Sequence, residues 1–402
     1  MTRKRILFVA EAVTLAQVVR LVTLARALDP ARYEVHFASA RFDELVFRGT
    51  DFVRHAIWSL SPAKIDARVA RGQRLYGGRT LATYVREERA LLQAVRPSLV
   101  IGDLRLSLAV SAPLERVRYA ALINAYWSPF AERERFPLPE HPIVKLLGVA
   151  LAERYFERAL PFVFRHFARP VNGLRRRHGL TDLGTLPEVL TFADHTLFPD
   201  IPELVPASGM PAHQRYLGYV PWAPPVPLPD WWSRLDPQRP TIYVTLGSSG
   251  RVQCLPAVLE AAGSRGVQVL LATAGRVRLG ALPPHVFAAD YLPGDLAARR
   301  ADLVVSNGGS TTGYQALAEG RPVLGIPFNL DQYLASQAIV RGGAGLMVRA
   351  GLADAPTIAS ALDRLLADRT FKARATTLAS LFGRSPAPAA FANLVDREVL
   401  EA

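Results

Sequence analysis

The sequence predicts an α/β protein made of two doubly wound domains, each with a parallel sheet covered by helices. Its 402 residues exceed one ordinary hydrophobic core and suit two domains of about 200 residues. Short apolar runs alternate with segments of helical periodicity in both halves of the chain. A proline-rich stretch at residues 220–238, with no helix or strand period, separates the halves as an extended linker.

The N-terminal half, residues 1–219, begins with the continuous apolar run Ile6–Ala10, which is typical of a strand buried on both faces of a parallel sheet. Helical spacing follows over Val13–Leu28 and ends before Pro30. The same alternation continues, with strands expected at Tyr33–Ala38, Leu99–Ile101 and Tyr119–Asn124 and a helix at Thr80–Val95. We therefore expect the first doubly wound sheet here.

A long, mostly apolar helical stretch, Ile143–His166, interrupts this alternation. One interpretation is a pair of core helices. The other is an apolar wall for an acceptor, or a surface that rests on a membrane. Phe162, Phe164 and Phe167, interleaved with Arg165 and Arg169, keep the second interpretation open.

The C-terminal half, residues 239–380, repeats the strand and helix alternation, and residues 381–402 continue as a helix. Strands are expected at Thr241–Leu246, Val267–Thr273, Val286–Ala288, Leu303–Ser306 and Val323–Ile326, with helices at Leu255–Ala262 and Thr312–Glu319. The same architecture is thus expected twice.

Composition limits the function classes. The single cysteine, Cys254, excludes a disulfide framework and a multi-cysteine metal site, and no histidine pair has zinc-motif spacing. We therefore expect no metal and no cofactor. The net charge of +13 suggests an anionic partner, but the arginines are dispersed and no nucleic-acid-binding motif accompanies them, so we expect no nucleic acid.

The N-terminal apolar run is too short for a signal peptide, and no apolar stretch approaches the roughly 20 residues that span a bilayer. We expect a cytoplasmic protein, with peripheral contact to the inner face of a membrane left open.

Three segments predict a ligand site, because ligands of doubly wound sheets bind at the carboxyl ends of the strands. The first is Thr245–Gly250, where Gly247, Ser248 and Ser249 form a turn that suits a diphosphate. The second, Ser306–Leu317, runs from a strand through adjacent glycines and hydroxyls into a helix, which is typical of an anion site. The third ends in Asp331 and Gln332, whose side chains suit neighbouring sugar hydroxyls.

Together these segments resemble the donor-binding signature of the UDP-glycosyltransferase family, inverting enzymes of the GT-B fold with two Rossmann-like domains facing across a cleft. The resemblance is carried by Asn307-Gly308-Gly309-Ser310-Thr311-Thr312-Gly313-Tyr314-Gln315-Ala316-Leu317, then Gly320-Arg321-Pro322, Pro327 and Asp331-Gln332. It implies that the final helix crosses back to the first domain.

The resemblance also implies residue roles on the donor side. The diphosphate would be bound by Gly308, Gly309, Ser310 and Thr312, with Thr311 in the same turn, and Gly247, Ser248 and Ser249 would close over it. Asp331 and Gln332 would hold the sugar, while Tyr291 and Leu292 would frame a uracil or thymine. Asn307 stands where relatives have a histidine, and Gln315 where they have the glutamate that holds the ribose; both substitutes are neutral.

On the acceptor side, the family's general base is a histidine in the loop after the first strand, and Gln17 stands at that position. An amide cannot accept the proton. Asp103, the family's orienting aspartate, is present. Three accounts remain open: Gln17 was introduced into an otherwise ordinary enzyme; Asp103 or Glu11 acts as base with a raised pKa; or the acceptor needs no strong base.

The resulting hypothesis is an inverting, metal-independent transfer of a sugar from a UDP- or TDP-sugar to a small lipophilic or aromatic acceptor. Candidate acceptor-binding residues are Tyr126, Trp127, Phe130 and Phe136. Two alternatives are a nucleotide-sugar epimerase and a non-catalytic GT-B relative that assists a transferase; Gln17 favours the latter.

Overall fold

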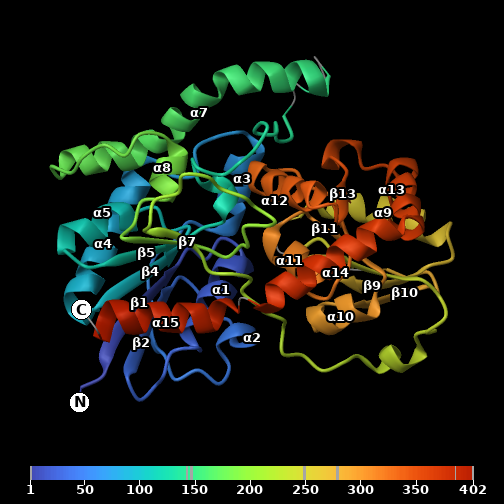
Figure 1. Ribbon diagram of the computed structural model, residues 1–402, viewed down its shortest axis with the longest axis horizontal. Coiled ribbons are helices and arrows are strands. Elements are labelled where there is room, and N and C mark those ends of the chain that lie inside the picture. Colours follow the sequence, from blue (N-terminus) through green and yellow to red (C-terminus); the bar gives the residue numbers. More distant parts are fainter. Residues whose placement is uncertain are drawn as a thin grey trace. The chain divides into compact units, whose positions relative to one another are not determined.

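The computed structural model describes residues 2–141, 144, 148–247, 250–277, 280–384 and 386–400. The chain forms two compact units. Unit 1 comprises Met1–Arg135, Glu153–Pro221 and Ser385–Ala402, and unit 2 comprises Phe136–Ala152 and Trp222–Arg384. Each unit is built on one parallel sheet (Figure 1).

The sheet of unit 1 has seven strands in the order β3-β2-β1-β4-β5-β6-β7. The order reverses between β1 and β4, which places the topological switch point of the sheet there. In register, Ala10 at the end of β1 lies opposite Asp103 at the end of β4. The strands are β1 Lys4–Ala10, β2 Tyr33–Ser39, β3 Val53–Ala56, β4 Leu99–Asp103, β5 Tyr119–Leu122, β6 His195–Phe198 and β7 Gln214–Tyr216.

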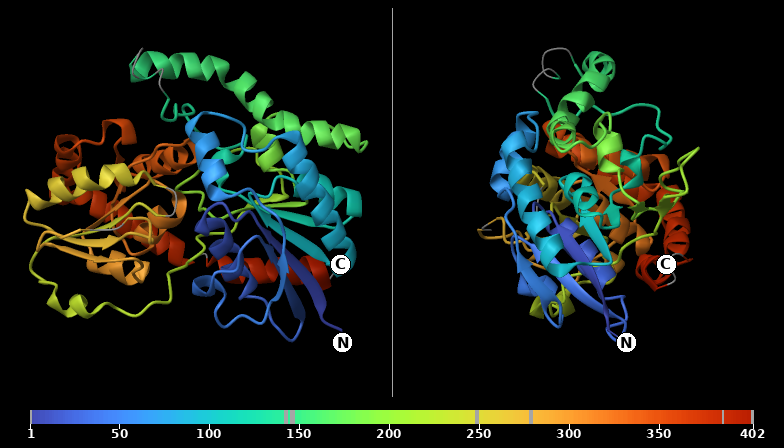
Figure 2. Two further views of the ribbon diagram at one scale, coloured as in Figure 1. Left: turned by 180° about the vertical axis from the view of Figure 1, so that it is seen from behind. Right: turned by 90° about the vertical axis from the view of Figure 1, so that its left-hand side faces the viewer.

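Helices cover both faces of this sheet, which explains why the last five residues of β1 are all buried. The right-hand view of Figure 2 shows α4 and α5 on one side of the strands and α15 on the other. The helices are α1 Leu15–Ala25, α2 Glu44–Phe47, α3 Pro62–Ala70, α4 Gly78–Val95, α5 Leu108–Glu115, α7 Val149–Arg177, α8 Leu186–Leu190 and α15 Ala387–Leu400, with the 3₁₀ turn η1 Ala125–Trp127.

The last helix, α15, is part of the core of unit 1. Its Phe391 is fully buried, with its ring centroid 5.9 Å from that of Phe8 on β1. The Tyr33 hydroxyl donates to the Asp396 carboxylate at 2.6 Å. Residues from the two ends of the chain therefore complete one hydrophobic core.

The sheet of unit 2 has six strands in the order β10-β9-β8-β11-β12-β13, with its switch point between β8 and β11. Ser306 ends β11 opposite Thr245 at the end of β8. The strands are β8 Thr241–Thr245, β9 Gln268–Ala272, β10 Val286–Ala289, β11 Leu303–Ser306, β12 Val323–Gly325 and β13 Gly345–Met347.

Six helices accompany these strands in unit 2, with three 3₁₀ turns, among the residues that the structure describes. They are α9 Leu255–Gly263, α10 Gly294–Arg300, α11 Ser310–Ala318, α12 Leu330–Arg341, α13 Ala355–Ala367, α14 Arg369–Arg384, η2 Asp230–Arg234, η3 Val252–Cys254 and η4 Ala350–Leu352. One face of the sheet is covered by α9 and α13, whose Val258 and Ile358 belong to the same buried apolar cluster as Val305 and Leu324 of the strands.

The predicted fold class, two doubly wound α/β units, is confirmed. The short strands β3, β6, β7 and β13 were not expected, because runs of three or four residues with interspersed polar side chains carry no clear period. The units also depart from the predicted boundary at Phe136–Ala152, which belongs to unit 2. Glu140 explains this: its N–H donates to Phe328 O at 3.0 Å and its carboxylate accepts from the Tyr333 hydroxyl at 2.6 Å.

Candidate active site

The turn between β11 and α11 is built from glycines that its neighbours require. Gly308 has φ +78°, and a Cβ there would overlap the Ser336 Oγ of α12. Its N–H donates to Ser306 Oγ at 3.1 Å, and the Gly309 N–H donates to Asn307 Oδ1 at 3.1 Å. Gly309 is the N-cap of α11, so the positive end of the helix dipole begins at this turn. The arrangement suits an anion.

The turn after β8 packs on Asn307 of the β11–α11 turn. Gly247 has φ +58°, and a Cβ on Gly250 would come within 2.9 Å of Asn307 Cβ. Arg276 fixes this turn, since its Nη1 donates to Gly247 O at 3.1 Å and to Gly250 O at 2.8 Å. Thus an exposed arginine, which sequence reasoning missed, stands beside the two glycine turns. The predicted residues Ser248 and Ser249 lie outside the described residues.

The Asp-Gln pair lies at the start of α12. Asn329 caps this helix by accepting from the Gln332 N–H at 3.0 Å. The Gln332 side chain is buried, and its Oε1 accepts from the Phe328 N–H at 3.1 Å, whereas Asp331 is exposed. Ser336, one turn further, donates to Gly308 O at 3.3 Å. The structure therefore joins this helix start to the glycine turn, with Gln332 bonded to the backbone.

The residues predicted to frame the nucleoside also come together. Leu292 is buried, and Gly294, two residues on, begins α10. A Cβ on Gly294 would overlap the Gln315 amide, so the side chain of Gln315 from α11 lies directly against this segment. Gln315 Nε2 donates to Trp222 O at 2.6 Å. The segment that contains Tyr291 and Leu292 thus lies close to Gln315 in unit 2.

In unit 1 the residues at the switch point form buried ion pairs. Asp103 is fully buried, and Arg20 of α1 binds both its oxygens, Nε to Oδ2 at 2.8 Å and Nη2 to Oδ1 at 2.7 Å. Arg20 Nη1 also donates to Asn124 Oδ1 at 2.8 Å, and Asn124 Nδ2 donates to Asp200 Oδ1 at 3.0 Å. The partner of Asp103 is therefore an arginine one turn beyond Gln17.

Glu11 belongs to a second buried cluster. Arg105 donates to Glu11 Oε2 at 2.9 Å and to Glu88 Oε1 at 2.7 Å, and the Tyr84 hydroxyl donates to Glu11 Oε1 at 3.1 Å. The Arg105 guanidinium lies 3.7 Å from the Tyr84 ring centroid. Burial raises the pKa of Glu11 above its ordinary value, and Arg105 opposes that shift only in part. One arginine thus serves two buried carboxylates.

Gln17 has a local role in α1. Its Oε1 accepts from the Thr14 N–H at 2.9 Å and from the Thr14 hydroxyl at 2.5 Å, which closes a capping box at the start of the helix. The side chain that replaces the expected base therefore caps a helix.

The predicted acceptor aromatics divide between the units. Tyr126 and Trp127 on η1 are buried, and the Trp127 ring centroid lies 6.5 Å from that of Phe164 on α7. Phe130 follows in the same unit and is partly exposed, whereas Phe136 belongs to unit 2. Unit 1 alone therefore holds three of the four.

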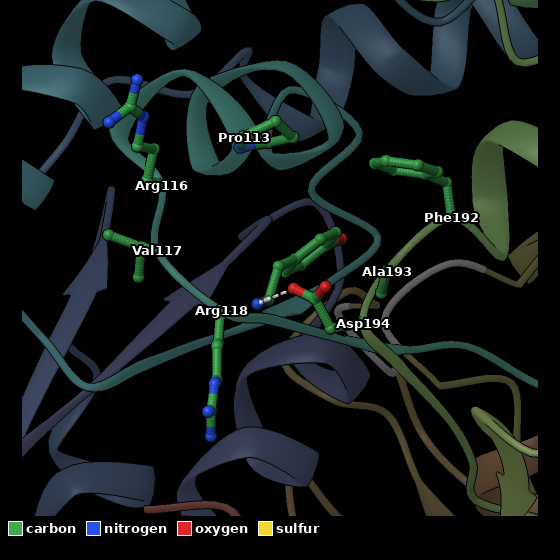
Figure 3. Close-up of a pocket in the computed structure, with 8 residues that line it drawn as sticks. Pro113, Arg116, Val117, Arg118, Phe192, Ala193 and Asp194 are labelled. Atoms are coloured by element: carbon green, nitrogen blue, oxygen red, sulfur yellow. Dashed lines mark hydrogen bonds between the residues drawn. The ribbon is translucent and has the colours of Figure 1, made fainter. Parts of the chain in front are cut away.

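A hollow of about 370 Å³ opens in unit 1 at the amino ends of β5 and β6 (Figure 3). No residue of the predicted site lines it. The Asp194 carboxylate accepts from the Tyr119 N–H at 2.8 Å, and Figure 3 shows the guanidinium groups of Arg116 and Arg118 directed away from its centre. It lies at the opposite end of the strands from Asp103.

A family model matches the C-terminal part of the chain. Residues 257–397 match the model of the erythromycin biosynthesis protein CIII-like C-terminal domain. This segment contains both the glycine turn before α11 and the Asp331-Gln332 pair.

Two curated relatives are similar over most of the chain. A PGL/p-HBAD biosynthesis glycosyltransferase of Mycobacterium tuberculosis is 46% identical over 95% of this chain and 89% of its own length. A PGL/p-HBAD biosynthesis rhamnosyltransferase of Mycobacterium bovis is 45% identical over 95% of this chain and 85% of its own length.

Solved structures share the fold. The spinosyn rhamnosyltransferase SpnG superposes with a TM-score of 0.71 and 20% identity, covering 98% of this chain and all of the other. The same enzyme complexed with thymidine diphosphate gives a TM-score of 0.69 over 98% of this chain and all of the other, at 20% identity.

Proposed function

Because the chain belongs to the UDP-glycosyltransferase-like family of GT-B glycosyltransferases, we propose that it transfers a sugar from a UDP- or TDP-sugar to a lipophilic or aromatic acceptor in glycolipid biosynthesis, with inversion at the anomeric carbon. That it is a glycosyltransferase follows from relatives of that name at 45–46% identity over 95% of the chain. The donor nucleotide, the stereochemistry and the acceptor are the proposed part.

The observation that carries the donor proposal is the glycine turn at the start of α11. Its unsubstituted backbone lets a diphosphate approach, and the helix dipole favours negative charge there. Arg276 adds a cation at the neighbouring turn. A rhamnosyltransferase among the relatives and a thymidine diphosphate complex among the structural neighbours favour TDP-rhamnose as the first donor to test.

In the proposed reaction the acceptor hydroxyl oxygen attacks the anomeric carbon, the bond to the diphosphate oxygen breaks, and the hydroxyl proton passes to water. The departing diphosphate carries the new negative charge, which the positive end of the α11 dipole and the Arg276 cation would stabilise. This needs no metal, and we propose no cofactor.

The contacts in unit 1 support the account in which the acceptor needs no strong base. Gln17 cannot take a proton, and both carboxylate oxygens of Asp103 already accept hydrogen bonds from Arg20. Glu11 is fully enclosed by its own partners. An acidic hydroxyl, such as a phenol, would lower the demand for a base. We therefore propose a phenolic acceptor, bound beside Tyr126 and Trp127.

The donor proposal is tested by the thermal unfolding of the purified protein with UDP, TDP and TDP-rhamnose. A ligand at a hundred times its dissociation constant should stabilise the fold by about 2.7 kcal/mol, which raises the midpoint by several degrees. Arg276→Met should weaken the preferred nucleotide about ten-fold, since it removes a cation and two hydrogen bonds.

Arg239→Met is the matched control. Arg239 is also exposed and also donates to a glycine carbonyl, that of Gly266, which is not part of the proposed donor site. Its variant should bind nucleotide like the wild type. Absence of a shift with every nucleotide, or equal losses in the two variants, would contradict the proposed donor site.

A further inference from the structure

One face of α7 combines aromatic and cationic side chains at regular intervals. Tyr155, Arg158, Phe162, Arg165 and Arg169 follow one another at steps of three, four, three and four residues, which places them on one side of the helix. All five are exposed; Phe162 keeps 73% of its surface and Tyr155 53%. We call these five residues the α7 outer stripe, and they lie within unit 1.

The orientation of the stripe is fixed by the opposite face of the helix. Ala168, Val171 and Leu174 are part of a hydrophobic core with α3, α4, α5 and α8, and Phe164 is buried beside Trp127. Of the phenylalanines noted in the sequence, Phe164 therefore faces inward and Phe162 outward. The helix cannot rotate to bury the stripe without taking these residues out of the core.

Charge on the stripe has one sign. Among the described residues, its three arginines make no ion pair. The acids in this part of the helix, Glu153 and Glu157, each stand two residues from Tyr155, about 200° around the axis. Aromatic rings and unpaired guanidinium groups thus face outward together, away from the acids.

These features fit the surface of an anionic bilayer better than a protein partner. Aromatic rings favour the headgroup level, and arginines bind lipid phosphates. A protein interface would place cations at the rim around an apolar centre, whereas here Arg158 lies between the two rings and Arg165 and Arg169 follow them. Among the helices that the structure describes, none is long and apolar enough to cross a membrane, so the contact would lie in the plane of the surface.

We propose that the α7 outer stripe docks the protein on anionic phospholipid bilayers, with Tyr155 and Phe162 entering the headgroup region and the arginines binding phosphates. This goes beyond the proposed sugar transfer, which does not require it. It would bring the enzyme to the surface in which a lipid-borne acceptor resides.

The test is co-sedimentation of the full chain with vesicles of phosphatidylcholine alone or mixed with phosphatidylglycerol. The wild type should bind the mixed vesicles at least about ten times better than the neutral ones, and raising the salt from about 0.1 M to about 0.5 M should weaken that binding. Arg158→Glu with Arg165→Glu should lower the affinity for mixed vesicles at least ten-fold, by about the same factor that separates the two vesicle types. Phe162→Ser should lower it several-fold in high and low salt alike, because its contribution is apolar.

Two controls match these variants. Arg369→Glu with Arg384→Glu makes the same charge change at exposed positions of α14, and Leu228→Ser removes an exposed apolar side chain from the linker. Both should bind vesicles nearly as the wild type does. Equal binding to neutral and anionic vesicles, or equal losses in controls and stripe variants, would overturn the proposal.

Self-association is the competing outcome. If the wild type is a dimer in solution and Phe162→Ser makes it a monomer without changing vesicle binding, the stripe joins two copies of the chain and the membrane proposal is wrong. Nucleotide-induced thermal shifts should be unchanged in all stripe variants. Vesicle binding without a nucleotide shift would therefore leave this proposal intact while contradicting the proposed donor site.

Discussion

The topological switch points of the two sheets differ in the residues that form them. In unit 1 the ends of β1 and β4 are filled with buried charged side chains: Glu11, Asp103, Arg20 and Arg105. In unit 2 the ends of β8 and β11 lead into glycines, whose backbone is held by small polar groups such as Ser306 and Ser336. The first switch point is thus filled by charged side chains, whereas the second is formed by glycine backbone with small polar neighbours.

The difference shows how a repeated fold can take two tasks. Buried ion pairs have a specific geometry but leave little room for a ligand, because each charge needs its partner. The start of a helix that follows a glycine turn has the positive end of the helix dipole and an open backbone, which suit an anionic ligand. We therefore expect substitutions at the first switch point to act mainly on stability, and substitutions at the second mainly on ligand binding.

The largest effect should come from Arg105→Met. It leaves Glu11 and Glu88 buried without their cation, and breaking a buried ion pair of this kind costs about 3–5 kcal/mol. Urea unfolding measures the loss. The control is Arg89→Met, whose partner Glu115 lies nearer the surface, and it should cost less than about 1 kcal/mol. Equal losses in the two variants would mean that the buried cluster is no more critical than a surface pair.

A smaller loss of stability, with a large loss of binding, should follow Gly308→Ala. The residue has φ +78° and its new Cβ would overlap Ser336 Oγ, so the turn must move. Gly266→Ala isolates the backbone contribution, because Gly266 has φ +64° with nothing near its Cβ position. We expect Gly266→Ala to lower the free energy of unfolding by about 1 kcal/mol. Gly308→Ala should lower it more, and it should also bind nucleotide at least ten-fold more weakly in calorimetric titration. Unchanged nucleotide binding by Gly308→Ala would remove the turn from the donor site.

The smallest effect is a pH dependence at the first switch point. Burial raises the pKa of Glu11 above its ordinary 4.5. A carboxyl group with a raised folded-state pKa contributes stability that is present below pH 4.5 and is lost as pH rises through the folded-state pKa. Glu11→Gln keeps the shape of the protonated side chain, so relative to the wild type it should become more stable as pH rises from 4 to 8 in urea unfolding.

Glu34→Gln should give the opposite trend. The hydrogen bond from His36 lowers the pKa of Glu34, so its contribution is lost as pH falls and the variant should be relatively least stable at neutral pH. If both variants followed the same trend, the inference that burial raises the pKa of Glu11 would be wrong.

Much of unit 2 could be read from the sequence because its signals are local. A strand that leads directly into glycines and hydroxyls occupies a few consecutive residues, and Gly308 at φ +78° stands where that pattern required it. Arg276 could not be found this way, because nothing in its own neighbourhood shows that it reaches the Gly247 carbonyl.

The site residues of unit 1 were harder to predict from the sequence, because their partners are also distant in the chain. The pairing of Arg20 with Asp103 joins residues 83 positions apart, and it depends on how α1 packs on the sheet. Gln17 drew attention as a missing base, but its bond to Thr14 is local helix capping. Likewise Phe164 and Phe162 are two residues apart and alike in type, yet the packing of α7 buries one and exposes the other. Whether such a side chain is buried or paired depends on residues that are distant in the sequence.

The position of α15 has a consequence for how the protein is made. Phe391 packs on Phe8, although the other six strands of unit 1 and the whole of unit 2 are translated between them. At typical synthesis rates of about 5–20 residues per second, the first strand leaves the ribosome roughly 20–80 s before the helix that covers it. During that interval the apolar surface of the N-terminal sheet that α15 covers is exposed. We therefore expect chaperones to bind the nascent chain until α15 has been synthesised.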